Sequence, residues 1–173
     1  MSFKKIHTYH KDREESYVTT RESCRGIVIS DGKILLSHEI IGDLYLIPGG
    51  GRENNEKNET CCAREIEEET GYRVRPLEHY LDLYHYFEYK PERQLNHYFI
   101  CEVMSKGEQK LTNYEKKIKL QPEWITIEEA YRIFGNYKSV DQEEKRKLYH
   151  REYLALKSYL EKKGVSLSVD LTS

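Results

Sequence analysis

The stretch GGGRENNEKNETCCAREIEEETGY, from Gly49 to Tyr72, decides the expected fold of this chain. Its second half, Asn58 to Thr70, is predicted to be a helix, and Gly71 is expected to end it because glycine readily adopts the left-handed conformation of a helix C-terminus. Four of the five positions from 65 to 69 are glutamate, directly after an arginine and shortly after three glycines. Such a concentration of negative charge calls for a physical explanation.

Three of the glutamates share one face of the predicted helix when 3.6 residues are placed on each turn: Glu65, Glu68 and Glu69. A second face, suited to a core, is formed by Ala63, Ile66 and Thr70, with Cys62 at its edge. Like charges at these spacings repel by a few tenths of a kcal/mol when they are solvated and by more when they are partly buried. A divalent cation removes this repulsion, and three carboxylates suit Mg²⁺ or Mn²⁺ rather than zinc or copper.

An acidic run of this kind is more often a solvated helix surface than a metal site. Two neighbouring features favour the metal site. Arg64 is the single cation in the run, and Glu56 lies eight residues before it, so that a Glu56–Arg64 pair can hold the preceding loop against the helix. Gly49, Gly50 and Gly51 lack side chains, which lets their backbone approach a metal or a phosphate closely.

The complete spacing Gly50-x5-Glu56-x7-Arg64-Glu65-Ile66-x-Glu68-Glu69-x-Gly71-Tyr72 resembles the Nudix box, the signature of the Nudix hydrolases, at every fixed position. Tyr72 stands where the family usually has an aliphatic residue, and Asn55 where many members have glycine. The flanks are similar too, and the resemblance covers roughly Cys24 to Ala130. It implies an α+β Nudix fold, an α/β/α sandwich with a mixed β-sheet between helices.

The resemblance also implies an activity and a ligand set. A divalent-metal-dependent hydrolase of this family cleaves the pyrophosphate bond of a nucleoside diphosphate linked to another moiety, with a metal-bound water as nucleophile. The implied cofactor is Mg²⁺, with Mn²⁺ as an alternative. The implied metal ligands are Glu65, Glu68, Glu69 and the carbonyl of Gly50. Gly49, Gly50, Glu56 and Arg64 are implied to form and orient the cofactor site.

Two glutamates are candidate catalytic residues, Glu65 and Glu115. Some Nudix enzymes take an acid–base or metal-binding glutamate from a later loop, and Glu115 lies in a comparable place, in LTNYEKK, nine residues before Trp124. A solvated loop charge is the commoner interpretation of Glu115. Which of the two glutamates is the general base therefore stays open.

The remaining pattern predicts alternating strands and helices in one α+β domain. A β-hairpin is expected around the Asp31-Gly32 turn, and a second antiparallel pair is expected over 79–89 and 94–103. A helix is predicted from about Gln142 to Lys163, with an apolar stripe of Tyr149, Tyr153, Leu156 and Leu160. Residues 1–163 are expected to form a single Nudix hydrolase domain, and residues 164–173 a polar C-terminal tail.

Composition limits the partners. The chain has 173 residues and a formal net charge of −2, which argues against broad nucleic-acid binding. No apolar run approaches the ~20 residues that cross a bilayer. The four cysteines lack zinc-site spacing and are interpreted as reduced, buried thiols of a cytoplasmic protein.

The expected partner is a small-molecule nucleoside diphosphate derivative, while the substrate, the number of metal ions and the oligomeric state, a homodimer included, are left open. Two alternatives remain. One is a non-catalytic Nudix-fold module that binds a nucleotide or a sugar nucleotide, and the other is a structural protein with a solvated acidic helix.

Overall fold

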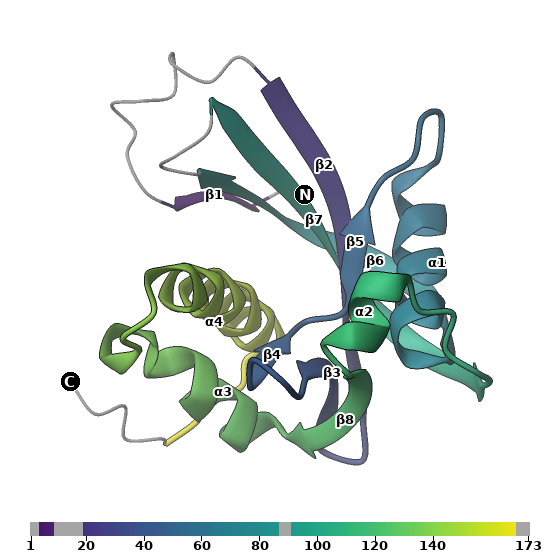
Figure 1. Ribbon diagram of the computed structural model, residues 1–173. Helices are drawn as coiled ribbons and strands as arrows, with labels where there is room; N and C mark the ends of the chain where they lie inside the picture. The colour runs from purple at the N-terminus through teal and green to yellow at the C-terminus, as the bar shows by residue number, and fades with distance from the viewer. Residues whose placement is uncertain (1–3, 9–18, 87–90, 169–173) are drawn as a thin grey trace.

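The computed structural model describes residues 4–8, 19–86 and 91–168 (Figure 1). The strands in this part of the chain are β1 (Lys4–Thr8), β2 (Thr19–Ser30), β3 (Lys33–Glu39), β4 (Leu44–Leu46), β5 (Gly49–Gly51), β6 (Tyr72–Tyr86), β7 (Glu92–Lys106) and β8 (Leu120–Thr126). The helices are α1 (Asn58–Thr70), α2 (Asn113–Lys117), α3 (Ile127–Gly135), the 3₁₀ helix η2 (Tyr137–Ser139) and α4 (Glu143–Lys163). Among the described residues, no helix is long and apolar enough to span a membrane.

The strands form one mixed sheet in the order β1-β6-β7-β2-β3-β4, with β5 paired to β2 and β8 paired to β3. The pairs β1–β6 and β2–β7 are parallel, while β6–β7, β2–β3, β2–β5, β3–β4 and β3–β8 are antiparallel. Strand β2 is central, because it pairs with β7 along most of its length, with β5 on its other edge, and with β3 at its end.

The first predicted hairpin is confirmed. Asp31 and Gly32 both have positive φ, 49° and 72°, as a two-residue turn that matches strand twist requires. The flanking pair Ile29 and Ile34 then faces each other across β2 and β3. This turn fixes the register of β3 against β2, which places Ser37 beside α1, the helix with the acidic face.

Helices cover the sheet on both sides, which confirms the sandwich (Figure 1). Helix α1 covers one face, over a core of Cys24, Val28, Leu35, Cys61, Cys62, Ile66, Val74, Phe99 and Cys101. Helices α3 and α4 cover the other face, over a larger core that includes Ile27, Ile34, Leu81, Leu83, Tyr98, Phe134 and Leu156. In the predicted stripe of α4, Tyr149, Leu156 and Leu160 are buried and Tyr153 is partly buried.

Some local expectations need correction. The LTNYEKK segment was expected to be a loop, but it forms helix α2, because Thr112 and Glu115 make a reciprocal capping box at its N-terminus. The three glycines after Pro48 form strand β5 rather than a bare turn, since they pair with Ser23, Cys24 and Arg25 of β2.

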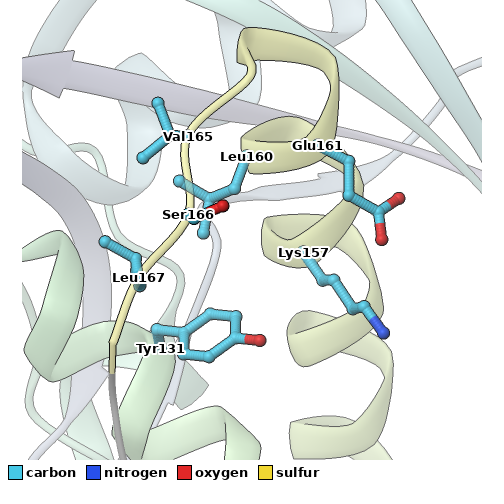
Figure 2. Close-up of a pocket in the computed structure, with 7 residues that line it drawn as sticks. All are labelled: Tyr131, Lys157, Leu160, Glu161, Val165, Ser166 and Leu167. Atoms are coloured by element: carbon cyan, nitrogen blue, oxygen red, sulfur yellow. The ribbon is translucent and has the colours of Figure 1, made fainter.

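Gly164 ends α4 with φ of 68°, and Leu167 then packs against the core. Leu167 and Tyr131 line a pocket beside the end of this helix (Figure 2). The first residues of the predicted tail, which begins at Gly164, therefore pack partly against the protein.

Candidate active site

Helix α1 is fixed by its apolar face. Cys61, Cys62, Ile66 and Thr70 are buried against the sheet, and Gly71 ends the helix with φ of 78° while its N–H donates to the Glu67 carbonyl at 2.8 Å. The predicted bounds Asn58–Thr70 and the predicted stop are confirmed. Because one face is held against the sheet, the glutamates on the adjacent face are turned toward β5 and β3.

Gly50 lies directly against Glu65. A Cβ atom added at Gly50 would be 2.2 Å from Glu65 Oε2, which is less than any real Cβ contact allows. The carbonyl of Gly50 accepts a weak hydrogen bond from the buried Cys61 thiol, with an S···O distance of 3.7 Å. The missing side chain is thus what lets the Glu65 carboxylate approach strand β5.

Arg64 connects the loop before α1 to the acidic face. Its Nε and Nη2 donate to the two carboxylate oxygens of Glu56 at 2.7 and 2.9 Å, and Nη2 also donates to the Gly51 carbonyl at 3.1 Å. Its Nη1 donates to Glu65 Oε1 at 2.8 Å and to Glu68 Oε2 at 3.2 Å. The Glu56–Arg64 pair expected from the sequence is present, and its hydrogen bond lowers the pKa of Glu56.

Glu69 points its carboxylate into the protein. Its Oε2 accepts hydrogen bonds from Ser37 Oγ at 2.8 Å and from the Gly49 N–H at 3.2 Å. Burial raises the pKa of Glu69 to about 7, although the charge of Arg25 opposes the shift. Burial likewise raises the pKa of Glu65, against the hydrogen bond from Arg64.

These observations test whether the site suits a divalent cation. Burial raises the pKa of both Glu65 and Glu69 because it disfavours their charged forms, and a nearby cation stabilises the ionised forms of both. The available donors are carboxylate and carbonyl oxygens, the ligand type that Mg²⁺ and Mn²⁺ prefer. The residues therefore fit the ion.

Glu115 lies closer to this site than its sequence position suggests. It lines a pocket of about 120 Å³ together with Glu69, Arg25 and Ser37. The segment before α2 is anchored to α1, since the Lys110 N–H donates to the Glu68 carbonyl at 2.8 Å. The Glu115 carboxylate itself accepts the Thr112 N–H at 2.7 Å.

Several residues of the site were not predicted. Arg25 is buried beside Glu69 and donates to Asn96 Oδ1 at 3.0 Å and to the Ile47 carbonyl at 3.1 Å. Ser37 contacts Glu69 from strand β3. Other polar residues flank both positions, in TTRESCRGIVIS of β2 and in KILLSHE of β3, so the sequence pattern does not single them out, and their partners are far away in the sequence.

Comparisons with known proteins identify the family of the chain. A family model described as "NUDIX domain" matches residues 20–151. Because the match spans most of the chain, the protein belongs to the NUDIX family, the Nudix pyrophosphohydrolases. A search of curated proteins found no match.

Solved structures support the fold. A NUDIX hydrolase from Nitrosomonas europaea is similar with a TM-score of 0.65 and 19% identity over 89% of this chain and 97% of its own. The ORF135 protein of E. coli has a TM-score of 0.60 and 17% identity over 84% and 91% of the two chains. A MutT NUDIX hydrolase from Burkholderia pseudomallei has a TM-score of 0.55 and 18% identity over 80% and 97%. At these sequence identities, the similarity to the solved structures is evidence for the fold alone.

Proposed function

We propose that the chain is a Mg²⁺-dependent hydrolase, also served by Mn²⁺, that opens the pyrophosphate bond of a nucleoside diphosphate linked to another group. The observation that carries the proposal is the placement of Glu65 against Gly50, beside Glu68 and within a network that Arg64 ties together. Glu69 and Glu115 line a pocket next to this network. A solvated acidic helix requires neither a glycine in contact with the carboxylate of Glu65 nor a buried Glu69 whose pKa is raised to about 7.

The proposed cation would be held by Glu65, Glu68, Glu69 and the Gly50 carbonyl. When bound, such an ion screens the charge of the phosphates and lowers the pKa of water. Glu56 and Arg64 orient the carboxylates, and Gly49 donates its N–H to Glu69 and leaves room beside it.

The general base is proposed to be Glu65 or Glu115. Glu65 accepts a hydrogen bond from Arg64 on the acidic face of α1, while Glu115, from α2, is among the residues that line the pocket. A base must come within hydrogen-bond reach of the proton that it removes. Glu115 meets this condition only if substrate or water enters the pocket that it shares with Glu69.

The size of the pocket and one structural relative guide the choice of substrates to test. A pocket of about 120 Å³ is smaller than the ~300–1,000 Å³ typical of small-molecule sites, so it suits part of a ligand and not a whole nucleotide. One structural relative is titled a UDP-X diphosphatase, with 19% identity and a TM-score of 0.59. Nucleoside diphosphate sugars therefore belong in any substrate panel.

The test is a screen of the purified full chain against nucleoside diphosphate derivatives, with Mg²⁺ or Mn²⁺, reading phosphate released after coupling to a phosphatase. Turnover that disappears with chelator and in Glu68→Gln supports the proposal. Equal turnover in Glu68→Gln and the unchanged protein overturns the metal role.

The competing function is a module that binds a nucleotide or sugar nucleotide without hydrolysing it. The complete box favours hydrolysis, because a binding module does not need every carboxylate. Calorimetric binding of a nucleotide with no product in Mg²⁺ or Mn²⁺ would select the binding module.

The proposal of a Nudix hydrolase also treats residues 1–163 as the domain and residues 164–173 as its tail. It places the protein in the cytoplasm on account of its four buried free cysteines.

A further inference from the structure

A second group of ligand-bearing side chains lies away from the acidic cluster, where β6 and β7 pair. His79 and Asp82 come from β6, and His97 comes from β7, directly opposite Asp82. Asp82 Oδ1 is 2.6 Å from His97 Nδ1 and 3.0 Å from His79 Nε2. Among the described residues, this is the group of three whose ligand atoms all lie within 4.8 Å of one another.

The orientation of His97 is set by a fourth residue. Its Nε2 is 3.0 Å from Glu22 Oε1, so that the ring lies between two carboxylates. If Nε2 donates its proton to Glu22, Nδ1 presents a lone pair toward Asp82. A ligand histidine held by a carboxylate on its other nitrogen is the usual arrangement around protein-bound zinc.

The charges on these groups require a cation or additional protons. With a neutral His97 donating to Glu22, the 2.6 Å contact would bring a nitrogen lone pair against a carboxylate oxygen. Either a second proton on His97 or one divalent ion bound by the three groups resolves this contact. The ion takes the place of that proton and uses the same three atoms, while the proton of a neutral His79 moves from Nε2 to Nδ1.

The surroundings hold these side chains in place. His79 stacks on the buried ring of Phe99, with ring centroids 4.6 Å apart, and His97 is only 5% exposed. Glu22 also pairs with Arg52, whose backbone N–H donates to the Glu22 carbonyl at 3.0 Å. Arg52 directly follows β5, so the cluster connects the β6–β7 pair and β2 to the start of the loop that leads to α1.

We propose that His79, Asp82 and His97 form a binding site for a zinc-class divalent transition metal, distinct from the carboxylate site on α1, with Glu22 as the residue that positions His97. Two imidazoles and one carboxylate suit Zn²⁺ or Co²⁺, whereas Mg²⁺ prefers oxygen ligands. Tetrahedral zinc ligands lie about 3.3 Å apart, so the two contacts of Asp82 with His97 and His79, at 2.6 and 3.0 Å, need to open by less than about 1 Å. The ion would tie β6 to β7 and, through Glu22, to β2.

The experiment uses the full chain freed of metal by chelation and kept in excess Mg²⁺, which occupies carboxylate sites and competes poorly for imidazole. Zn²⁺ is titrated by calorimetry, and Co²⁺ is followed by its visible absorption, which reports nitrogen ligation. The expected result is one equivalent of Zn²⁺ per chain, a Co²⁺ spectrum with nitrogen ligands, and a rise in the midpoint of thermal unfolding with Zn²⁺.

Three variants locate the ion. His79→Gln, at the more exposed of the two histidines, is expected to lose the stoichiometric Zn²⁺ while keeping its circular dichroism spectrum. Glu22→Gln is expected to weaken binding by about 10- to 100-fold, the usual effect of losing a carboxylate behind a ligand histidine. His38→Gln is the matched control, because His38 also lies between two carboxylates, Glu123 at 2.7 Å and Asp43 at 3.0 Å, but has no second histidine among the described side chains that contact it in this way.

Glu68→Gln separates the two metal sites, since it alters the carboxylate site and should leave the Zn²⁺ equivalent unchanged. The proposal is overturned if the unchanged protein takes up no Zn²⁺ in excess Mg²⁺. It is equally overturned if His79→Gln retains the ion or if Glu68→Gln loses it. In each of these cases the cluster is a hydrogen-bonded network that holds no metal.

Discussion

Arg64 donates two parallel hydrogen bonds to Glu56, Nε to Oε1 at 2.7 Å and Nη2 to Oε2 at 2.9 Å, although the two residues are eight positions apart in the sequence. The same guanidinium also reaches Glu65 and the Gly51 carbonyl. A planar group with several donors in fixed directions can make all of these contacts at once, whereas an ammonium cannot. Arg64 therefore sets the positions of the loop and of the carboxylates together.

Arg64→Lys is expected to reduce kcat/KM by about 10- to 100-fold, the range seen when groups that orient metal ligands are lost. The positive charge is retained in this variant, so the fall in kcat/KM reports the loss of the hydrogen-bond geometry of the guanidinium group. Steady-state kinetics on the substrate found by the screen gives the ratio. Arg73→Lys is the control, because Arg73 is exposed and pairs only peripherally with Glu67 at 3.1 Å; equal activity of both variants would refute the orienting role.

Glu69 is expected to make the metal-free protein less stable as the pH rises. Its pKa is about 7 in the folded chain, against an ordinary value of 4.5. Between these two values the folded state holds more protons than the unfolded state, so the free energy of unfolding falls with increasing pH. The loss between about pH 5 and about pH 7.5 is on the order of 2 kcal/mol.

Urea denaturation in chelator at both pH values measures this effect. Glu69→Gln carries no titrating proton at this position and should lose less stability than the unchanged protein over the same range. Added Mg²⁺ at the higher pH should recover stability in the unchanged protein and recover less in the variant. Parallel pH profiles for the two proteins would show that Glu69 does not titrate in this range.

Glu115→Gln separates chemistry from helix capping. Glutamine can replace glutamate in a capping box, so the Thr112 N–H keeps its acceptor and α2 should persist. If Glu115 is the general base, kcat falls by about 10²- to 10⁴-fold with little change in thermal unfolding. Glu129→Gln is a matched control at the same position of α3, where Thr126 accepts the Glu129 N–H at 3.1 Å. Unchanged kcat in Glu115→Gln would leave Glu65 as the base.

The helix of the site could be predicted from the sequence because its determinants are local. Gly71 ends α1, the apolar positions select its buried face, and the Glu56–Arg64 spacing spans one loop. The contact of Ser37 with Glu69 could not be predicted in this way, since it joins residues 32 positions apart through the register of β3.

Arg151 and Glu152 show the same limit more sharply. Within the charged sequence of α4 they resemble a solvated pair, yet they are only 1% and 0% exposed. Packing of α4 on the sheet brings Glu152 to the Ile47 N–H, where its Oε2 accepts at 3.2 Å, and Arg151 Nε donates to its Oε1 at 2.7 Å. Burial of this pair depends on the tertiary arrangement, which local pattern does not encode.

Glu152→Gln is expected to destabilise the protein by about 3 to 5 kcal/mol, because it leaves the buried charge of Arg151 without its partner. Glu161→Gln, in the exposed Lys4–Glu161 pair near the end of the same helix, should change the free energy of unfolding by no more than about 0.5 kcal/mol. Urea denaturation measures both. Similar small losses in the two variants would mean that Arg151 finds another partner or reaches water.

Gly50→Ala and Gly49→Ala should fail for different reasons. At Gly50 the new Cβ meets Glu65 Oε2 at 2.2 Å, at the mobile end of a side chain, so the carboxylate moves and the backbone stays. At Gly49 the φ of 151° is strained for alanine, and the Cβ meets the Cys24 carbonyl oxygen at 2.1 Å, so the backbone itself must shift. We expect Gly50→Ala to reduce kcat/KM by about 10- to 100-fold and to lower the free energy of unfolding by less than about 1 kcal/mol. Gly49→Ala is expected to lower the free energy of unfolding by several kcal/mol. Gly42→Ala, whose Cβ meets nothing nearer than Glu39 Oε2 at 3.7 Å, provides the control. Full activity in Gly50→Ala would mean that the position of the Glu65 carboxylate against this glycine is not required for turnover.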